Sequence, residues 1–149
     1  MTKLVETAQT ALTPEAAFAE VAAFENIDRW DPGVIRSVKR TSGETGVGTI
    51  YDLDLRYGKR KLQMAYTIVE YRPGQRVVLH GEGPMIDAVD TISVEAAGSG
   101  TVVTYEADLK LTGIGRLFQP FMGSRFAALG SAAGSGLRKW LGELERIRA

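Results

Sequence analysis

The sequence predicts an α+β fold in which a seven-stranded curved antiparallel sheet is covered by two short helices and one long C-terminal helix. Two patterns carry this prediction. From Val34 to Leu111, apolar and polar residues alternate with a period of two, as they do along half-buried strands. From about Gly115 to Ile147, apolar residues recur at spacings of three, four and seven, which marks one face of a helix.

The start of the chain predicts one strand and then two short helices, or one bent helix. Residues 3–12 are rich in small, β-branched and apolar types, as in a strand. Thr13 and Pro14 suit a helix start, because Thr offers an N-cap oxygen and Pro fits the first turn. The helical residues within 14–31 must end at the Asp-Pro-Gly of 31–33, since proline disfavours helix at the residue before it.

Six further strands are expected, separated by turns that contain glycine. They lie near 34–41, 49–57, 60–71, 76–83, 86–96 and 101–111. One face of these strands is apolar and the other polar, as in an antiparallel meander with a single covered face. The last helix, of about 28 residues and roughly 42 Å, is the only element long enough to cover that face, and we expect Pro120 in its first turn.

Composition excludes several classes of site. We expect residues 1–149 to form one domain, since 44% of them are hydrophobic and 24% charged. The absence of cysteine excludes disulfides, Cys-ligated metals and thiol nucleophiles, and the single histidine, His80, excludes a His-rich metal site. The 18 basic and 18 acidic residues balance, which disfavours nucleic acid as a partner. We expect no cofactor and no metal.

No part of the sequence predicts a membrane span. The N-terminus lacks the apolar core of a signal peptide, and no stretch approaches the roughly 18 apolar residues of a spanning helix. We therefore expect a cytoplasmic protein. A homodimer is possible, although no feature demands one.

The order of elements and several turn motifs resemble a known family. The motifs are Thr13-Pro14-Glu15-Ala16-Ala17-Phe18, Trp30-Asp31-Pro32-Gly33-Val34, Gly46-Val47-Gly48-Thr49, the run from Ile68 to Val77, and the run from Gly98 to Tyr105. Together they resemble the START-like helix-grip superfamily, often called SRPBCC, and within it the polyketide cyclase/dehydrase group. The resemblance implies a birch-allergen-like fold with an apolar cavity between the sheet and the long helix. Most members bind lipids, sterols, polyketides or other hydrophobic molecules, and a minority are cyclases, aromatases or dehydratases.

Given this resemblance, the residues expected to face inward form a candidate ligand site. Aromatic and soft side chains dominate it, and tyrosine hydroxyls could orient a flat or flexible apolar ligand. Trp30 is expected near the mouth. The candidate ligand-binding residues are Trp30, Tyr51, Leu53, Leu55, Met64, Tyr66, Asp90, Tyr105, Phe118, Phe121, Met122, Arg125, Phe126 and Leu129. The alternative is that these side chains simply fill the core.

Asp90 is the most informative polar residue of this set. It shares strand parity with Ile86, Ala88, Ile92 and Val94, so an inward carboxylate is predicted, and such a group is costly unless it is paired or protonated. The alternative is a shifted register or a wet edge position.

The sequence leaves open the roles of Arg125 and of a basic hairpin. Arg125, at the border of the helical stripe, could pair with Asp90 or with a ligand carboxylate, or could extend to solvent. The basic residues Arg56, Lys59, Arg60 and Lys61 surround Gly58 in a predicted hairpin, where they could touch an anionic membrane or a partner, or simply keep the hairpin soluble. His80, Asp52 and Asp54 are expected on the polar face of the strands.

The helix between Phe126 and Leu137 contains three glycines, each of which costs roughly 1 kcal/mol relative to alanine. Small side chains there could leave room for a ligand, let the helix approach the sheet closely, or make it bent or mobile.

Two functions from different classes follow. The first is a carrier or sensor that binds a hydrophobic small molecule such as a lipid or polyketide. The second is a metal-free polyketide cyclase or dehydratase, with Asp90, Arg125 and either Tyr66 or Tyr105 as candidate catalytic residues. A third, weaker hypothesis is an interaction module for membranes or larger assemblies.

Overall fold

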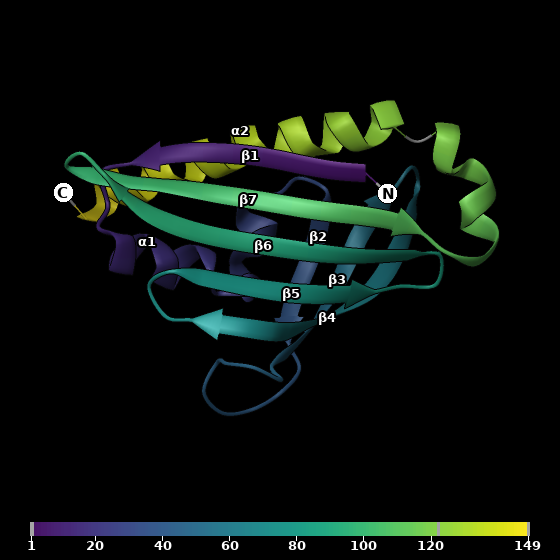
Figure 1. Ribbon diagram of the computed structural model, residues 1–149, viewed down its shortest axis with the longest axis horizontal. Coiled ribbons are helices and arrows are strands. Elements are labelled where there is room, and N and C mark those ends of the chain that lie inside the picture. Colours follow the sequence, from purple (N-terminus) through teal and green to yellow (C-terminus); the bar gives the residue numbers. More distant parts are fainter. Residues whose placement is uncertain (1, 122, 149) are drawn as a thin grey trace.

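A single curled antiparallel sheet organises the protein (Figure 1). The computed structural model describes residues 2–121 and 123–148, except for the side chains of 57, 118, 119, 121, 123 and 124. The strands are β1 (Thr2–Thr10), β2 (Val34–Lys39), β3 (Ile50–Tyr57), β4 (Arg60–Arg72), β5 (Arg76–Glu82), β6 (Ile86–Ala97) and β7 (Gly100–Leu111). Their order is β1-β7-β6-β5-β4-β3-β2, so β2 to β7 form a meander and β1 joins the far side of β7. The predicted seven-stranded antiparallel sheet is confirmed.

Two short helices connect β1 to β2, which settles the choice that the sequence left open. They are α1 (Pro14–Val21) and the 3-10 helix η1 (Phe24–Arg29). Thr13 caps α1 as predicted, because its hydroxyl oxygen accepts a hydrogen bond from the backbone N–H of Ala16 at 3.1 Å. The chain then turns at the Asp-Pro-Gly of 31–33, where the N–H of Val34 donates to the carbonyl of Asp31 at 3.0 Å.

The long C-terminal helix begins later than the sequence predicts. The helical region expected from about Gly115 divides into a 3-10 segment, η2 (Gly113–Phe121), and α2 (Gly123–Arg148), so the expectation of Pro120 in the first turn of the long helix is wrong. Gly113 has a φ of 56°, which is left-handed backbone, and Pro120 lies inside η2 rather than in α2. Proline lacks an amide hydrogen and restricts the residue before it, so α-helix cannot run through this point without distortion.

The glycines of α2 let the helix lie very close to β1 and to the turn after η1. An added Cβ would lie 3.2 Å from the Leu4 side chain at Gly130, 2.7 Å from the Glu6 side chain at Gly134, and 1.8 Å from the Trp30 carbonyl oxygen at Gly136. Figure 1 shows α2 running beside β1. Of the three explanations weighed for these glycines, close approach is the one that the contacts support.

The core lies between the concave face of the sheet and the helices. Its fully buried side chains include Tyr51 and Leu53 on β3, Phe24 on η1, and Leu137 and Leu141 on α2. The two α2 residues among them, Leu137 and Leu141, belong to the C-terminal half of the helix.

We predict opposite effects for two alanine substitutions in α2. Gly136→Ala should destabilise the protein by roughly 1–3 kcal/mol, because its Cβ would collide with the backbone of Trp30. Gly142→Ala should stabilise it by up to about 1 kcal/mol, since no atom lies within 4 Å of the added Cβ and alanine favours helix. Urea denaturation of both variants measures these changes. Equal stabilities for the two variants would contradict the seating of α2 on Trp30.

Candidate functional site

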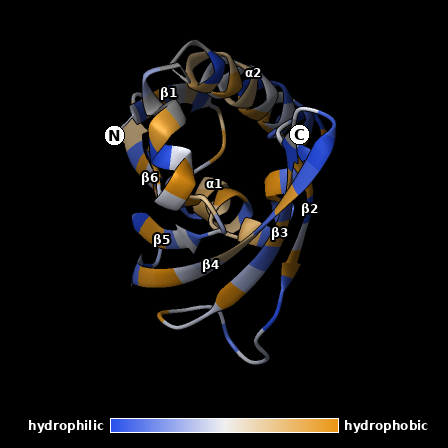
Figure 2. Cartoon of the chain, turned by 90° about the vertical axis from the view of Figure 1, so that its right-hand side faces the viewer, coloured by the Kyte–Doolittle hydropathy of each residue, from blue (hydrophilic) through white to orange (hydrophobic). Residues whose placement is uncertain are grey.

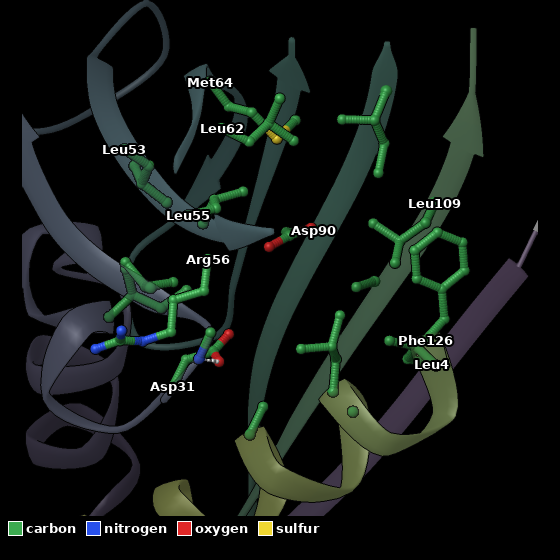
Figure 3. A pocket seen from close by; sticks show the side chains of 18 of the residues that line it. Leu4, Asp31, Leu53, Leu55, Arg56, Leu62, Met64, Asp90, Leu109 and Phe126 are labelled. Atoms are coloured by element: carbon green, nitrogen blue, oxygen red, sulfur yellow. Dashed lines mark hydrogen bonds between the residues drawn. The ribbon is translucent and has the colours of Figure 1, made fainter. Parts of the chain in front are cut away.

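A cavity of about 170 Å³ lies between the concave face of the sheet and α2. Leucines from four strands form much of its wall, and Phe126, Leu129 and Ala133 close it from α2 (Figure 3). The wall leucines are Leu4, Leu53, Leu55, Leu62, Leu109 and Leu111. Several of them are only half buried, which is the exposure expected for apolar side chains around an accessible hollow.

Asp90 places a carboxylate in this apolar wall. Its residue is 2% exposed, and its Oδ2 accepts a hydrogen bond from the Tyr105 hydroxyl at 2.9 Å. Its Oδ1 is buried and has no hydrogen-bond partner among the described residues. In Figure 3 the carboxylate points away from β6, toward the space enclosed by the sheet and α2. An unpaired buried carboxylate oxygen is costly, so this oxygen is an acceptor available to a ligand.

Aromatic residues pack around the hydrogen-bonded pair Asp90 and Tyr105. Tyr105 lies opposite Ile92 on the adjoining strand, and its ring meets the Trp30 ring edge-on, with centroids 5.2 Å apart. Tyr66 lies on β4 beside Gly81 of β5, where an added Cβ would come within 2.5 Å of the Tyr66 ring. Glycine at position 81 therefore allows this ring to lie flat across β5. The Tyr66 hydroxyl meets the Met64 sulfur, a weak acceptor, at 3.9 Å.

A second carboxylate, Asp31, lies at the same cavity. Its Oδ1 accepts a hydrogen bond from the Gly33 N–H at 2.8 Å, within the turn that leads into β2. Asp31 lies near enough to contribute to the raised pKa values of Asp90, Tyr66 and Tyr105. Of the described residues that line the cavity, only Arg56 is basic; it is exposed, and its Nε donates to the Pro32 carbonyl at 3.1 Å.

Burial raises the pKa values of Asp31, Asp90, Tyr66 and Tyr105. It raises the pKa of Asp90 to about 7, with a smaller opposing effect from the Tyr105 hydrogen bond. Burial likewise raises the pKa of Asp31 to about 6, opposed by the hydrogen bond from Gly33. The pKa values of Tyr66 and Tyr105 are raised well above the usual range, first by burial and then by the charge of Asp90. Both carboxyl groups therefore change charge near neutral pH.

The structure places the predicted site residues in three groups. The first group lines the cavity and comprises Leu53, Leu55, Met64, Tyr66, Asp90, Tyr105, Phe126 and Leu129. The second group, Trp30, Tyr51 and Arg125, does not line the cavity. The expectation of Trp30 at the mouth is wrong, because this residue is 3% exposed and packs against the Tyr105 ring. Tyr51 packs against Phe24, and Arg125 is exposed. The hydrogen-bond partner of Asp90 is thus Tyr105 and not Arg125. The third group, the side chains of Phe118 and Phe121 and all of Met122, lies outside the described residues.

Two polar residues that line the cavity, Asp31 and Arg56, do not stand out in the sequence as site residues. Asp31 is expected only in a turn, and Arg56 only in a basic hairpin that could touch a membrane or a partner or keep the hairpin soluble. The Asp-Pro-Gly sequence was the available signal for Asp31, because it places a carboxylate where the chain enters the sheet. Strand parity could not reveal Arg56, which reaches the cavity rim from the end of β3.

The other polar residues lie where the alternation predicts them. His80 is exposed, with Nδ1 3.9 Å from a Glu82 oxygen, and the exposed Asp52 pairs with Arg40. The described part of the chain holds no cluster of three or more His, Cys, Asp or Glu side chains suited to a metal ion. Within residues 2–121 and 123–148, no helix combines the length and apolar character needed to cross a membrane.

Comparison with known proteins points to one family. The family model described as polyketide cyclase/dehydrase and lipid transport matches residues 1–145. No curated protein sequence matches the chain significantly. Solved structures share the fold at low identity, and three are typical. A protein from Thermus thermophilus is 15% identical with a TM-score of 0.77, covering 95% of this chain and 98% of that one.

The other two have descriptive names. A START superfamily protein from Mycobacterium smegmatis is 13% identical with a TM-score of 0.74, covering 97% of this chain and 99% of that one. The Zhui aromatase/cyclase from Streptomyces sp. R1128 is 12% identical with a TM-score of 0.69, covering 99% of this chain and 95% of that one. At these identities the likeness establishes the helix-grip fold.

We predict that Asp90→Asn flattens the dependence of stability on pH. The pKa of Asp90 rises from 3.8 to about 7 on folding. Between these pH values the folded protein keeps a proton that the unfolded chain has released, so this group's contribution to stability falls as pH rises. Asparagine does not titrate, and the variant should be more stable than the parent by roughly 1–3 kcal/mol above neutral pH.

Urea denaturation from about pH 4 to pH 8 measures this effect. Glu95→Gln, which changes an exposed carboxylate on the same strand, serves as the control and should leave the profile unaltered. Parallel profiles for Asp90→Asn and the parent would show that Asp90 does not titrate in this range.

Proposed function

Because the chain belongs to the polyketide cyclase/dehydrase and lipid transport family, we propose that it binds a hydrophobic small molecule in the cavity under α2, as a carrier or sensor. The observation that carries the proposal is an apolar cavity whose wall contains one buried carboxylate oxygen without a partner. An apolar hollow with a few polar groups is the usual form of a small-molecule site.

The size of the cavity supports a small apolar group as the part that is enclosed. A cavity of about 150 Å³ lined by Leu, Ile and Phe binds benzene, and this one measures about 170 Å³. We therefore propose that one ring or a short alkyl chain occupies it, and that any larger ligand extends through the mouth past Arg56. The proposed apolar contacts are Leu53, Leu55, Met64, Phe126 and Leu129.

The polar groups support a ligand that donates a hydrogen bond at its enclosed end. Asp90 Oδ1 needs a donor, and the Tyr105 hydroxyl is already committed to Oδ2. A hydroxyl, phenol or N–H on the ligand would satisfy Oδ1, whereas a ligand carboxylate would face Asp90 and Asp31 without a buried cation. The end of the ligand that enters the cavity therefore carries a hydrogen-bond donor and no negative charge.

Native mass spectrometry of freshly purified protein, together with analysis of an organic extract, tests this function. We expect one apolar compound at a ratio near one to one. Leu109→Trp should abolish the bound mass, because the larger ring would occupy the cavity from β7.

Val89→Trp is the matched control, since Val89 is exposed on β6, and this variant should retain the compound. A clean apo mass for the parent, or equal retention by both variants, would count against the proposed site. Circular dichroism should confirm that both variants are folded.

An acid–base enzyme is the second candidate, and one observation favours it. Burial raises the pKa of Asp90 to about 7, which suits a general base near neutral pH. The proposed step is removal of a proton from a ligand carbon next to a carbonyl group, with Asp90 Oδ1 as the acceptor. The Tyr66 hydroxyl would donate a hydrogen bond to the ligand's carbonyl oxygen, where negative charge develops.

Incubation of the extracted compound with the protein separates the two candidates. A carrier returns the compound with its mass and connectivity unchanged. An enzyme converts it, and Asp90→Asn should then reduce turnover by roughly 100-fold or more while the compound still binds. Conversion that is equally fast with Asp90→Asn would exclude Asp90 as the base.

A further inference from the structure

The cavity opens at one end of the sheet, and four segments surround the opening. We call residues 56–61, 82–87, 110–117 and 125–129 the rim. Each segment supplies a residue that lines the cavity, namely Arg56, Met85, Gly115 and Leu129. Figure 2 views the molecule from this end, with η2, the β3–β4 hairpin and the start of α2 grouped around it. The rim is thus one surface built from distant parts of the sequence.

Charge is distributed unevenly between the rim and the rest of the chain. The rim holds 7 Lys and Arg residues against 2 acidic ones, whereas the remaining residues hold 11 against 16. The basic rim residues are Arg56, Lys59, Arg60, Lys61, Lys110, Arg116 and Arg125, and all of them are exposed. None of them forms an ion pair with a described residue, although six such pairs occur elsewhere. A neutral protein therefore carries a concentrated positive field at the mouth of its cavity.

Large apolar side chains stand out from the same surface. Ile114 and Leu117 on η2 are 73% and 74% exposed, and the rim residues Met85 and Leu129 are also exposed. The segment that bears Ile114 is anchored, because the Thr112 N–H donates to the Met85 carbonyl at 2.8 Å and the Gly115 N–H to the Thr112 carbonyl at 3.0 Å. The exposed side chains of Ile114 and Leu117 therefore belong to the same surface as the basic rim residues.

We propose that the rim is a docking surface for an anionic lipid bilayer. Lys and Arg near an anionic leaflet are attracted to its surface potential, and exposed Ile and Leu side chains gain by entering the interface between head groups and acyl chains. Exposed apolar residues ringed by acidic charge would suit a basic protein instead, but here the charge is positive on every rim segment except 82–87.

Docking in this way turns the opening of the cavity toward the bilayer. An apolar ligand could then pass between membrane and cavity without crossing water, which links the surface to the proposed function. The docking itself does not depend on the ligand, because the charges and the apolar tips are present on the protein alone. Failure of ligand binding and failure of docking are therefore separate outcomes.

Co-flotation with vesicles tests the proposal, using phosphatidylcholine alone and phosphatidylcholine mixed with phosphatidylglycerol. We expect the protein to float with the anionic vesicles at low salt and to be released by high salt. Arg60→Glu combined with Lys61→Glu should weaken partitioning by roughly tenfold or more. Ile114→Asn combined with Leu117→Asn should also weaken it, through loss of the inserted side chains.

Lys139→Glu combined with Arg146→Glu is the matched control, because it makes the same change of net charge at exposed positions of the C-terminal half of α2. This variant should float like the parent. The proposal is wrong if the parent stays unbound with both vesicle types, if the rim variants float like the parent, or if the control loses as much binding as the rim charge reversal.

Discussion

The seating of α2 against β1 and Trp30 is the contact on which the rest of the structure depends. Gly130, Gly134 and Gly136 bring the helix to within touching distance of Leu4, Glu6 and the Trp30 carbonyl. A helix held this closely to one edge of a curled sheet cannot also fill the centre of the concave face. The space left under its first turns is the cavity, so the glycines contribute to the cavity indirectly, by fixing where the helix lies.

Two carboxyl groups lie in the apolar wall of this cavity. Asp90 lies on β6, an inner strand, and lines the cavity together with Phe126, Leu129 and Ala133 of α2, whereas Asp31 follows Trp30, whose carbonyl lies against Gly136 of the helix. Neither carboxylate has a basic partner inside the cavity, and burial raises both pKa values. A carboxyl group that lowers stability when ionised has no value to the fold alone, which favours a role toward a bound molecule.

Much of the fold follows from sequence, since strand and helix periods are local properties. The alternation through β3 to β7 identifies the strands, and the parity of Asp90 with Ile86 and Ile92 correctly turns it inward. Parity fails where backbone geometry is irregular. Asp31 belongs to a turn with no period, and Pro120 lies inside the 3-10 segment η2 and not in the first turn of α2. Arg125 lies at the border of the helical stripe, where periodicity leaves both directions open, and the structure shows it exposed.

If the cavity binds a small molecule as proposed, the distribution of charge between its wall and the rim would favour some ligands and one orientation. The acidic residues that line the cavity are Asp90 and Asp31, whereas seven Lys and Arg residues lie in the rim. An anionic group would therefore be repelled from the interior and retained outside, and a hydrogen-bond donor would be favoured inside. An amphiphile satisfies both conditions in a single orientation, with its apolar and donor-bearing end enclosed and its acidic end at the rim. The same orientation matches a lipid-like molecule whose polar end remains at a membrane surface.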